Sequence, residues 1–190
     1  MIKRLLAAAA ALVSTSVLAG ELPPMTWAEY HACKYNEGQT PASVADFADS
    51  WNAWMDSEDR DDYSAAILNP LYRSPPTAVD MLWVGATSSN ESMAAGQSAW
   101  RSSDVFNDWP ASDCSISMLA TQYAVGSPIP ENVMTDEMVV AYWYCNLNEG
   151  STIQDVYTAH SATMKAGAEA EAVQESRIIV PRQGVPAQFA

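Results

Sequence analysis

The chain has 190 residues, with 23 acidic and 9 basic side chains and a formal net charge of −14. A field this negative repels phosphate backbones and anionic lipid headgroups, and the cations are scattered singly, which argues against nucleic acid or a membrane surface as partners. Hydrophobic residues make up 48% of the chain, enough for a core in one large or two small domains.

The amino-terminal segment has the pattern of a secretory signal peptide. Lys3 and Arg4 precede an apolar run from Leu5 to Leu18, and the small residue Ala19 follows it. The run is shorter than the roughly 20 residues that a bilayer span requires. We expect cleavage after Ala19, so that residues 1–19 are removed and a periplasmic or secreted protein remains, with no membrane association.

The mature chain opens with a strand, a turn and a helix. Alternation predicts a strand over Thr26–Tyr35, followed by a turn at residues 36–38 whose glycine can adopt a positive φ. Thr40 suits the N-cap of a helix that runs to about Ser57, because apolar residues recur at helical spacing. A second strand is predicted over Tyr63–Leu68.

The next segment completes an order of six elements. A third strand is predicted over Val79–Ala86, a helix capped by Asn90 extends to Trp100, and a fourth strand covers Cys114–Tyr123. The order β-α-β-β-α-β is that of a ferredoxin-like unit, which would occupy residues 20–125.

A second copy of part of this unit follows it in the sequence. The segment Cys33–Thr40 recurs, 112 positions later, as Cys145–Thr152, and six of the twelve positions from Cys33 to Val44 are identical in the second copy. In the turn, the repeated residues are Asn36, Glu37, Gly38 and Thr40 in the first copy and Asn148, Glu149, Gly150 and Thr152 in the second.

The second copy predicts only three elements. A strand is expected over Met138–Leu147, a helix from Thr152 to about Ala170 and a strand over Ser176–Val180. Residues 131–182 would therefore form a partial βαβ repeat packed on the first unit, with a tail at residues 183–190.

The repeated turn has a mechanical explanation and a functional alternative. Glycine makes the turn, threonine caps the helix, and a carboxylate near the amino end of a helix is favoured by the helix dipole. We favour this explanation. The alternative is that Glu37 and Glu149 face a shared cavity as a base or as ligands.

A strand, a Glu-Gly turn and a helix, followed by Trp83-Val-Gly85 and a helix that ends near Trp100, resemble the dimeric α/β barrel superfamily. The resemblance implies an α+β fold, with a ferredoxin-like βαββαβ unit and a partial βαβ repeat, and a possible homodimer. That superfamily includes monooxygenases, isomerases, haem-binding enzymes and non-catalytic stress proteins, so the fold alone leaves the function open.

The ferredoxin-like order also implies a disulfide. In that order the fourth strand lies antiparallel beside the first, which places Cys33 near Cys114, and we predict that these two cysteines pair. Cys145 would be the odd thiol, or would replace Cys33 at that edge. The three cysteines lack the close spacing of zinc ligands, and no metal site is predicted.

The first strand carries the best candidate for a catalytic site. Alternation places Glu29 and His31 on one face, where they could act as a general base and a proton shuttle in a polar cavity. Small residues such as Ala28 and Ala32 lie on the other face and suit close packing against helices. The alternative is that Glu29 and His31 form a merely structural pair.

Aromatic residues suggest a ligand pocket. The sequence holds seven tryptophans and eight tyrosines, and we expect Tyr30, Trp83, Trp100 and Trp143 to contribute to an apolar lining. Trp143 is the second-copy counterpart of His31, so only the first copy would retain a proton-handling pair. His160 could serve as a haem ligand, but we favour a solvated or capping histidine, and no cofactor is predicted.

The sequence thus predicts an exported protein that binds a small apolar or aromatic ligand. One alternative is a cofactor-independent enzyme of the monooxygenase or isomerase kind, with Glu29 and His31 handling protons. Another is a structural or assembly protein whose half-repeat completes its sheet with another subunit.

Overall fold

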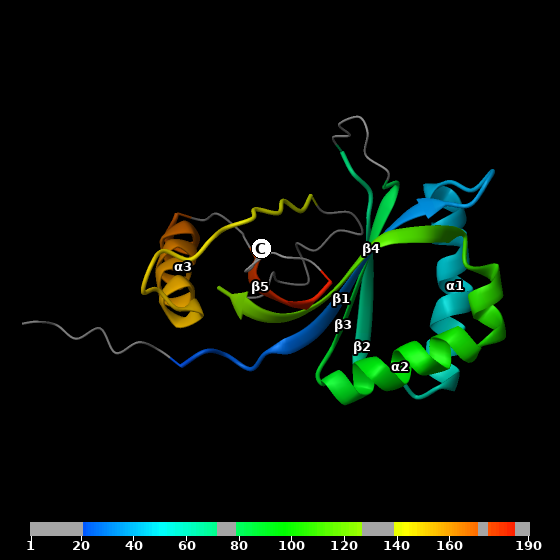
Figure 1. The fold of residues 1–190 in the computed structure, drawn as a ribbon, viewed down its shortest axis with the longest axis horizontal. Coiled ribbons are helices and arrows are strands. Elements are labelled where there is room, and N and C mark those ends of the chain that lie inside the picture. The colour runs from blue at the N-terminus through cyan, green and yellow to red at the C-terminus, as the bar shows by residue number, and fades with distance from the viewer. Residues whose placement is uncertain (1–20, 72–78, 127–138, 171–174, 185–190) are drawn as a thin grey trace, which may run out of the picture.

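The structure is a computed structural model, and it describes residues 21–71, 79–126, 139–170 and 175–184. These residues form an α+β fold in which a five-stranded antiparallel sheet has helices on both faces (Figure 1). The elements are β1 (Thr26–Tyr35), α1 (Pro41–Ser57), β2 (Tyr63–Leu68), β3 (Met81–Thr87), α2 (Asn90–Ser102), the 3-10 helix η1 (Asp104–Asp108), β4 (Ala111–Val125), α3 (Ile153–Glu169) and β5 (Ser176–Gln183).

The strand order in the sheet is β2-β3-β1-β4-β5, and every neighbouring pair is antiparallel. Strand β1 therefore lies in the middle, with β3 on one side and β4 on the other. Together with the β-α-β-β-α-β order of the first elements, this arrangement is compatible with a ferredoxin-like fold.

Local signals explain where the helices begin. Helix α1 starts at Pro41 after an extended Thr40, whose backbone N–H donates to Ser43 Oγ at 3.2 Å. The predicted cap of α2 was one residue late: Ser89 is the N-cap, because its hydroxyl accepts from the Ser92 backbone N–H at 3.0 Å.

The fourth strand is longer than predicted. It begins at Ala111 rather than Cys114 and continues to Val125, and the irregular segment before it contains η1. The extra length lets β4 pair with β1 over most of its course and with β5 towards its carboxyl end.

The second half of the chain adds α3 and β5 to this sheet. Thr152 caps α3 as predicted, since the Asp155 N–H donates to Thr152 Oγ1 at 3.3 Å and the Thr152 N–H donates to Asp155 Oδ2 at 2.8 Å. Met164 of α3 packs against Val125 and Ile178, so the helix is anchored on β4 and β5.

The strand predicted over Met138–Leu147 is not formed. Met138 lies outside the described residues, and residues 139–147 follow an irregular path with one isolated bridge at Cys145. The physical reason is a lack of partners: β1 obtains its hydrogen bonds from β3 and β4, and the half-repeat has no counterpart of either strand.

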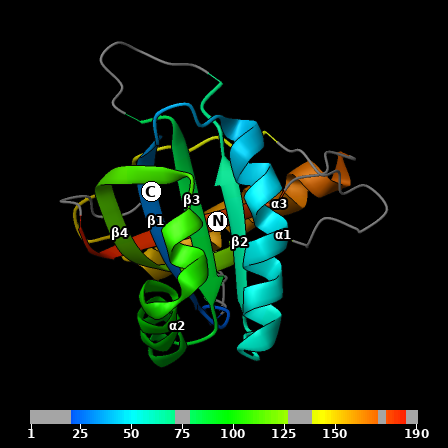
Figure 2. The ribbon, with the colours of Figure 1, turned by 90° about the vertical axis from the view of Figure 1, so that its right-hand side faces the viewer.

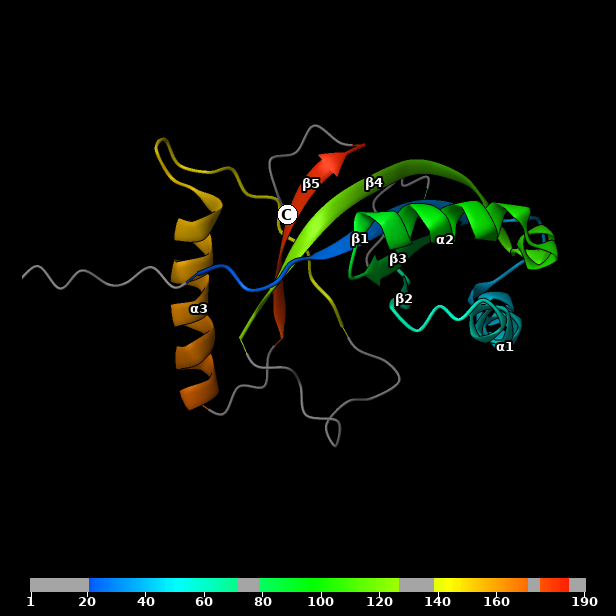
Figure 3. The ribbon, with the colours of Figure 1, turned by 90° about the horizontal axis from the view of Figure 1, so that it is seen from below.

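Helices α1 and α2 cover one face of the sheet and α3 lies on the other side (Figures 1 and 3). Figure 2 looks onto the face that carries α1 and α2. Residues Cys33 of β1, Val44 of α1 and Met81 of β3 share a buried cluster between α1 and the sheet. Among the described residues, no helix is long and apolar enough to cross a membrane.

Glu29 and His31 share a face of β1 that lines a cavity, as expected, but the expectation that the small residues face the helices α1 and α2 is wrong. Glu29, His31 and Cys33 point towards α1 and α2, whereas Ala28 and Tyr30 pack on the opposite side. Large rings on the helices hold α1 and α2 away from the sheet, so this face does not require small residues. Glu29 and His31 on it are satisfied by hydrogen bonds.

Candidate functional site

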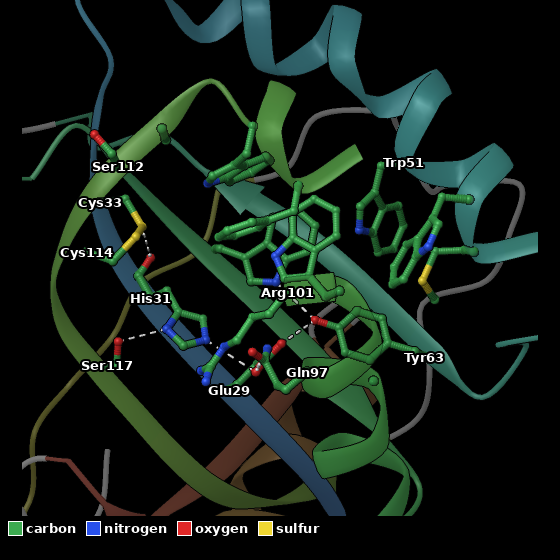
Figure 4. A pocket seen from close by; sticks show the side chains of 18 of the residues that line it. Glu29, His31, Cys33, Trp51, Tyr63, Gln97, Arg101, Ser112, Cys114 and Ser117 are labelled. Carbon is green, nitrogen blue, oxygen red and sulfur yellow. Dashed lines mark hydrogen bonds and ion pairs between the residues drawn. A yellow bond between two sulfur atoms is a disulfide. The ribbon is translucent and has the colours of Figure 1, made fainter. Parts of the chain in front are cut away.

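A cavity of about 350 Å³ lies between the sheet and the helices α1 and α2 (Figure 4). Its size is within the usual range for small-molecule pockets. Seven aromatic side chains line it: Trp51, Trp54, Tyr63, Trp83, Trp100, Phe106 and Trp109. They come from two helices, two strands and the segment before β4, so tertiary packing assembles the site.

The tryptophans form a continuous wall of edge-to-face contacts. Trp83 lies 5.3 Å, between ring centroids, from Trp51 on one side and from Trp109 on the other, and Trp109 contacts Trp100 at 6.1 Å. The rings make the wall apolar, and because each ring is held by its neighbours, the shape of the wall is fixed before a ligand binds.

A buried carboxylate lies on the polar side of the cavity. Glu29 is only 5% exposed, and the Tyr63 hydroxyl donates to its Oε1 at 2.5 Å. Gln97 Nε2 and His31 Nε2 both donate to Oε2, the latter at 3.2 Å (Figure 4). Three donors from β1, β2 and α2 thus hold the carboxylate in one position.

Tyr63 reaches Glu29 because β3 carries a glycine between them. The Trp83 indole N–H donates to the Tyr63 hydroxyl at 3.0 Å, which places the phenol over Gly85. A Cβ at Gly85 would lie 1.8 Å from the Tyr63 oxygen and 2.9 Å from Glu29 Oε1. The absence of a side chain at this position makes the hydrogen bond possible.

Alkaline pH is expected to destabilise the protein through tyrosines whose pKa is raised by burial, chiefly Tyr63 and Tyr30. Burial raises the pKa of Tyr63, and the nearby Glu29 carboxylate raises it further; burial likewise raises the pKa of Tyr30. The folded state keeps these protons when the unfolded chain loses them, so the stabilisation is complete below about pH 10 and declines above it. Each phenol should remove about 1.4 kcal/mol of unfolding free energy per pH unit there.

Urea unfolding between pH 8 and 11 measures this loss. Tyr63→Phe should make the alkaline decline shallower, since it removes one of the ionisations that cause it. Tyr144 is 78% exposed, and Tyr144→Phe serves as the control that leaves the slope unchanged. Equal slopes in the wild type and Tyr63→Phe would contradict the expectation.

His31 connects the carboxylate to a serine on the neighbouring strand. The residues His31 and Ser117 are register partners in the β1–β4 ladder, and the His31 Nδ1 lies 2.8 Å from Ser117 Oγ. The His31 side chain is 26% exposed and Ser117 is exposed. The imidazole therefore bridges a buried acid and an accessible hydroxyl.

Two arginines add positive charge to the lining. Arg60 and Arg101 both contribute to the cavity. The Nε of Arg60 is buried and has no hydrogen-bond partner within the described parts of the chain. A buried donor without a partner costs stability, and the guanidinium groups that line the cavity are the cationic donors that a bound molecule can meet.

A disulfide forms part of the cavity lining. Cys33 and Cys114, the pair predicted from the sequence, are joined, and this bond ties β1 to β4 close to His31 and Ser117. Cys145 is a free, exposed cysteine. A disulfide of this kind is compatible with an exported protein.

The structure brings four of the predicted site residues together. Glu29, His31, Trp83 and Trp100 all line the cavity. Two predicted ligand-binding residues do not line it. Tyr30 packs on the opposite face, where its ring contacts that of Tyr142, and Trp143 is 72% exposed.

Sequence reasoning missed Ser117, Tyr63 and Gln97 as partners of the histidine and the acid. Ser117 lies on a predicted strand and Tyr63 at the start of another, but their meeting depends on the strand order and register. Gln97 was assigned to a helix, and no local signal pointed it towards Glu29.

The repeated turns act mechanically. Gly38 and Gly150 adopt positive φ values of 78° and 77°, which glycine accommodates without strain. Glu37 and Glu149 are exposed, and neither contributes to the cavity. The Asn36 side chain donates to the Trp109 carbonyl at 3.0 Å and so ties the first turn to the segment before β4.

The remaining histidine has a local partner. His160 Nε2 lies 2.7 Å from Ser176 Oγ, which links α3 to β5. Within the described ranges, no group of three or more His, Cys, Asp or Glu side chains is arranged to hold a metal ion.

Comparisons of the chain with models of protein families, with curated proteins and with solved structures found no match.

Proposed function

We propose that this protein is an exported binding protein that takes a small apolar or aromatic ligand into the cavity between the sheet and helices α1 and α2. The observation that carries the proposal is the aromatic wall around a space of about 350 Å³. Pockets with a mainly apolar lining and a few convergent polar groups are typical of small-molecule sites.

The polar groups restrict the ligand further. Glu29 already accepts from three side chains, so it offers little to a ligand's donor. The guanidinium groups of Arg60 and Arg101, in contrast, line the cavity and can only donate. The favoured ligand has an aromatic or apolar body and an acceptor oxygen, such as a carbonyl or a carboxylate.

The finer assignments of fold and location belong to the same proposal. The strand order supports a ferredoxin-like unit of the dimeric α/β barrel type, and the added α3 and β5 support a partial repeat. The disulfide supports an oxidising compartment such as the periplasm. Homodimerisation, which the resemblance implies, is checked by the mass of the mature protein in solution.

Binding of N-phenyl-1-naphthylamine, a neutral apolar aromatic probe, tests the cavity. We expect the probe to gain fluorescence and to quench the tryptophans on binding. Gly96 of α2 lines the cavity, and Gly96→Leu should weaken binding at least roughly tenfold, or about 1.4 kcal/mol, because the new side chain occupies the space. The stability of α2 should not suffer, since leucine favours helix over glycine by up to about 0.8 kcal/mol.

Gly167→Leu is the matched control. Gly167 also lies within a helix, α3, and a Cβ there meets no atom within 4 Å. This variant should bind the probe as the wild type does. Absence of probe binding, or equal affinity of the wild type and Gly96→Leu, would overturn the proposal.

A further inference from the structure

We infer that Ser117, His31 and Glu29 form a nucleophile, a base and an orienting acid for acyl transfer from small esters of apolar or aromatic acids. This inference rests on the proposed binding of such molecules in the cavity. Serine nucleophiles with a histidine base and a carboxylate are identified by geometry and role rather than by sequence position.

The three side chains are aligned by two neighbouring strands. Glu29 and His31 are two residues apart on one face of β1, and Ser117 is opposite His31 on β4. The Ser117 Oγ is 2.8 Å from His31 Nδ1, and His31 Nε2 is 3.2 Å from Glu29 Oε2 (Figure 4). Both the nucleophile–base distance and the base–acid distance are hydrogen-bond distances, as such a site requires.

The acid selects the useful tautomer of the histidine. Since the Glu29 carboxylate can only accept, a neutral His31 carries its proton on Nε2 and donates it to Oε2. Nδ1 is then left with a lone pair, directed at the Ser117 hydroxyl. The same carboxylate would stabilise the imidazolium that forms when Nδ1 takes the serine proton.

Burial decreases from Glu29 through His31 to Ser117, so the nucleophile is the most accessible of the three side chains. The side chain of Glu29 is 6% exposed and that of His31 is 26% exposed, whereas Ser117 is an exposed residue that lines the cavity. The acid is therefore shielded from water, and the hydroxyl is accessible to a substrate. The Tyr63 and Gln97 hydrogen bonds keep the acid from rotating away.

The rest of the cavity suits an acyl group. The tryptophan wall offers apolar contact area to the acid part of an ester. The guanidinium groups of Arg60 and Arg101 line the same space and are the cationic donors available to the charge that develops on the carbonyl oxygen.

The reaction balances with water as the second substrate. Ser117 Oγ bonds to the carbonyl carbon while its proton moves to His31 Nδ1. The carbon–oxygen bond to the alcohol then breaks, and His31 returns the proton to the leaving alkoxide. Water, deprotonated by His31, next attacks the acyl-serine, which releases the carboxylic acid and restores the Ser117 hydroxyl.

A fluorophosphonate probe and 4-nitrophenyl butyrate test the site on the mature protein. We expect a mass increase on the peptide that contains Ser117, together with hydrolysis of the ester. Ser117→Ala should abolish both signals, and His31→Gln should lower the labelling rate at least about 100-fold. Glu29→Gln should lower the hydrolysis rate by a similar factor.

Ser176→Ala provides the matched control. Ser176 forms the same kind of short hydrogen bond with His160, at 2.7 Å, but lies outside the cavity. Labelling and hydrolysis should be unchanged in this variant. Labelling that is absent, or that persists in Ser117→Ala, would overturn the inference.

Naphthylamine binding separates this inference from the binding proposal. If the wild type binds naphthylamine but is not labelled by the fluorophosphonate, the acyl-transfer inference fails and the binding proposal stands. If the wild type neither binds naphthylamine nor is labelled at Ser117, both the binding proposal and the acyl-transfer inference fail.

Discussion

Replacing Cys33 and Cys114 together with alanine is expected to lower the free energy of unfolding by about 4 to 5 kcal/mol. The disulfide joins residues 81 positions apart, so its removal restores a large loop-closure entropy to the unfolded chain. Guanidinium unfolding of the protein without reductant measures the difference.

Two further results check the origin of this loss. Cys145→Ala, which removes the free and exposed cysteine, should leave the unfolding free energy within about 0.5 kcal/mol of the wild type. Added reductant should destabilise the wild type but not the double alanine variant. A loss below about 1 kcal/mol in the double variant would mean that the disulfide does not constrain the unfolded chain as the loop length implies.

The parts of the fold that follow from local sequence signals were predictable. The alternation in β1 and the helical spacing after Thr40 both lie within one segment, and β1 and α1 occupy the predicted residues. The same holds for α3, where the Thr152 cap and the apolar spacing agree. Signals of this kind need no knowledge of neighbours in space.

The segment 139–147 shows why strand propensity was insufficient. Its aromatic and β-branched residues are typical of a strand, and the repeat aligns it with β1. However, a strand also requires partner edges, and those of β1 are supplied by β3 and β4, which have no second copy. Repetition of the sequence therefore repeated the turn and the helix but not the strand before them.

Glu29 and His31 were predictable from the sequence, whereas Ser117, which depends on the pairing of two strands, was not. Glu29 and His31 share a face of β1 through simple alternation, and that much could be read from one strand. Ser117 could not, because counting from the Cys33–Cys114 pair along a regular ladder places Ile116 opposite His31. The ladder shifts register between Ala32 and Lys34, and this irregularity brings Ser117 to the histidine.

Substituting Gly85 with alanine is expected to cost about 3 kcal/mol of stability and to disrupt the polar side of the cavity. In the interior of a strand, alanine normally gives a stability higher than glycine does, by roughly 0.5 to 1 kcal/mol. Here the new methyl group would lie 1.8 Å from the Tyr63 oxygen, so the phenol must move. Its hydrogen bonds to Glu29 and Trp83 would then be lost, and Glu29 would be left with fewer donors.

Thermal and urea unfolding of four variants establish whether this contact is the cause. Gly167→Ala, in a helix with open space around it, should stabilise the protein by up to about 1 kcal/mol, which shows the intrinsic gain from removing a glycine. In a Tyr63→Ala background, Gly85→Ala should cost little or become stabilising, because the obstructing phenol is gone. If Gly85→Ala costs as much with Tyr63 absent as with Tyr63 present, the glycine is not required for the approach of Tyr63 to Glu29. That outcome would also remove the reason for placing Gly85 among the residues that position the carboxylate for His31.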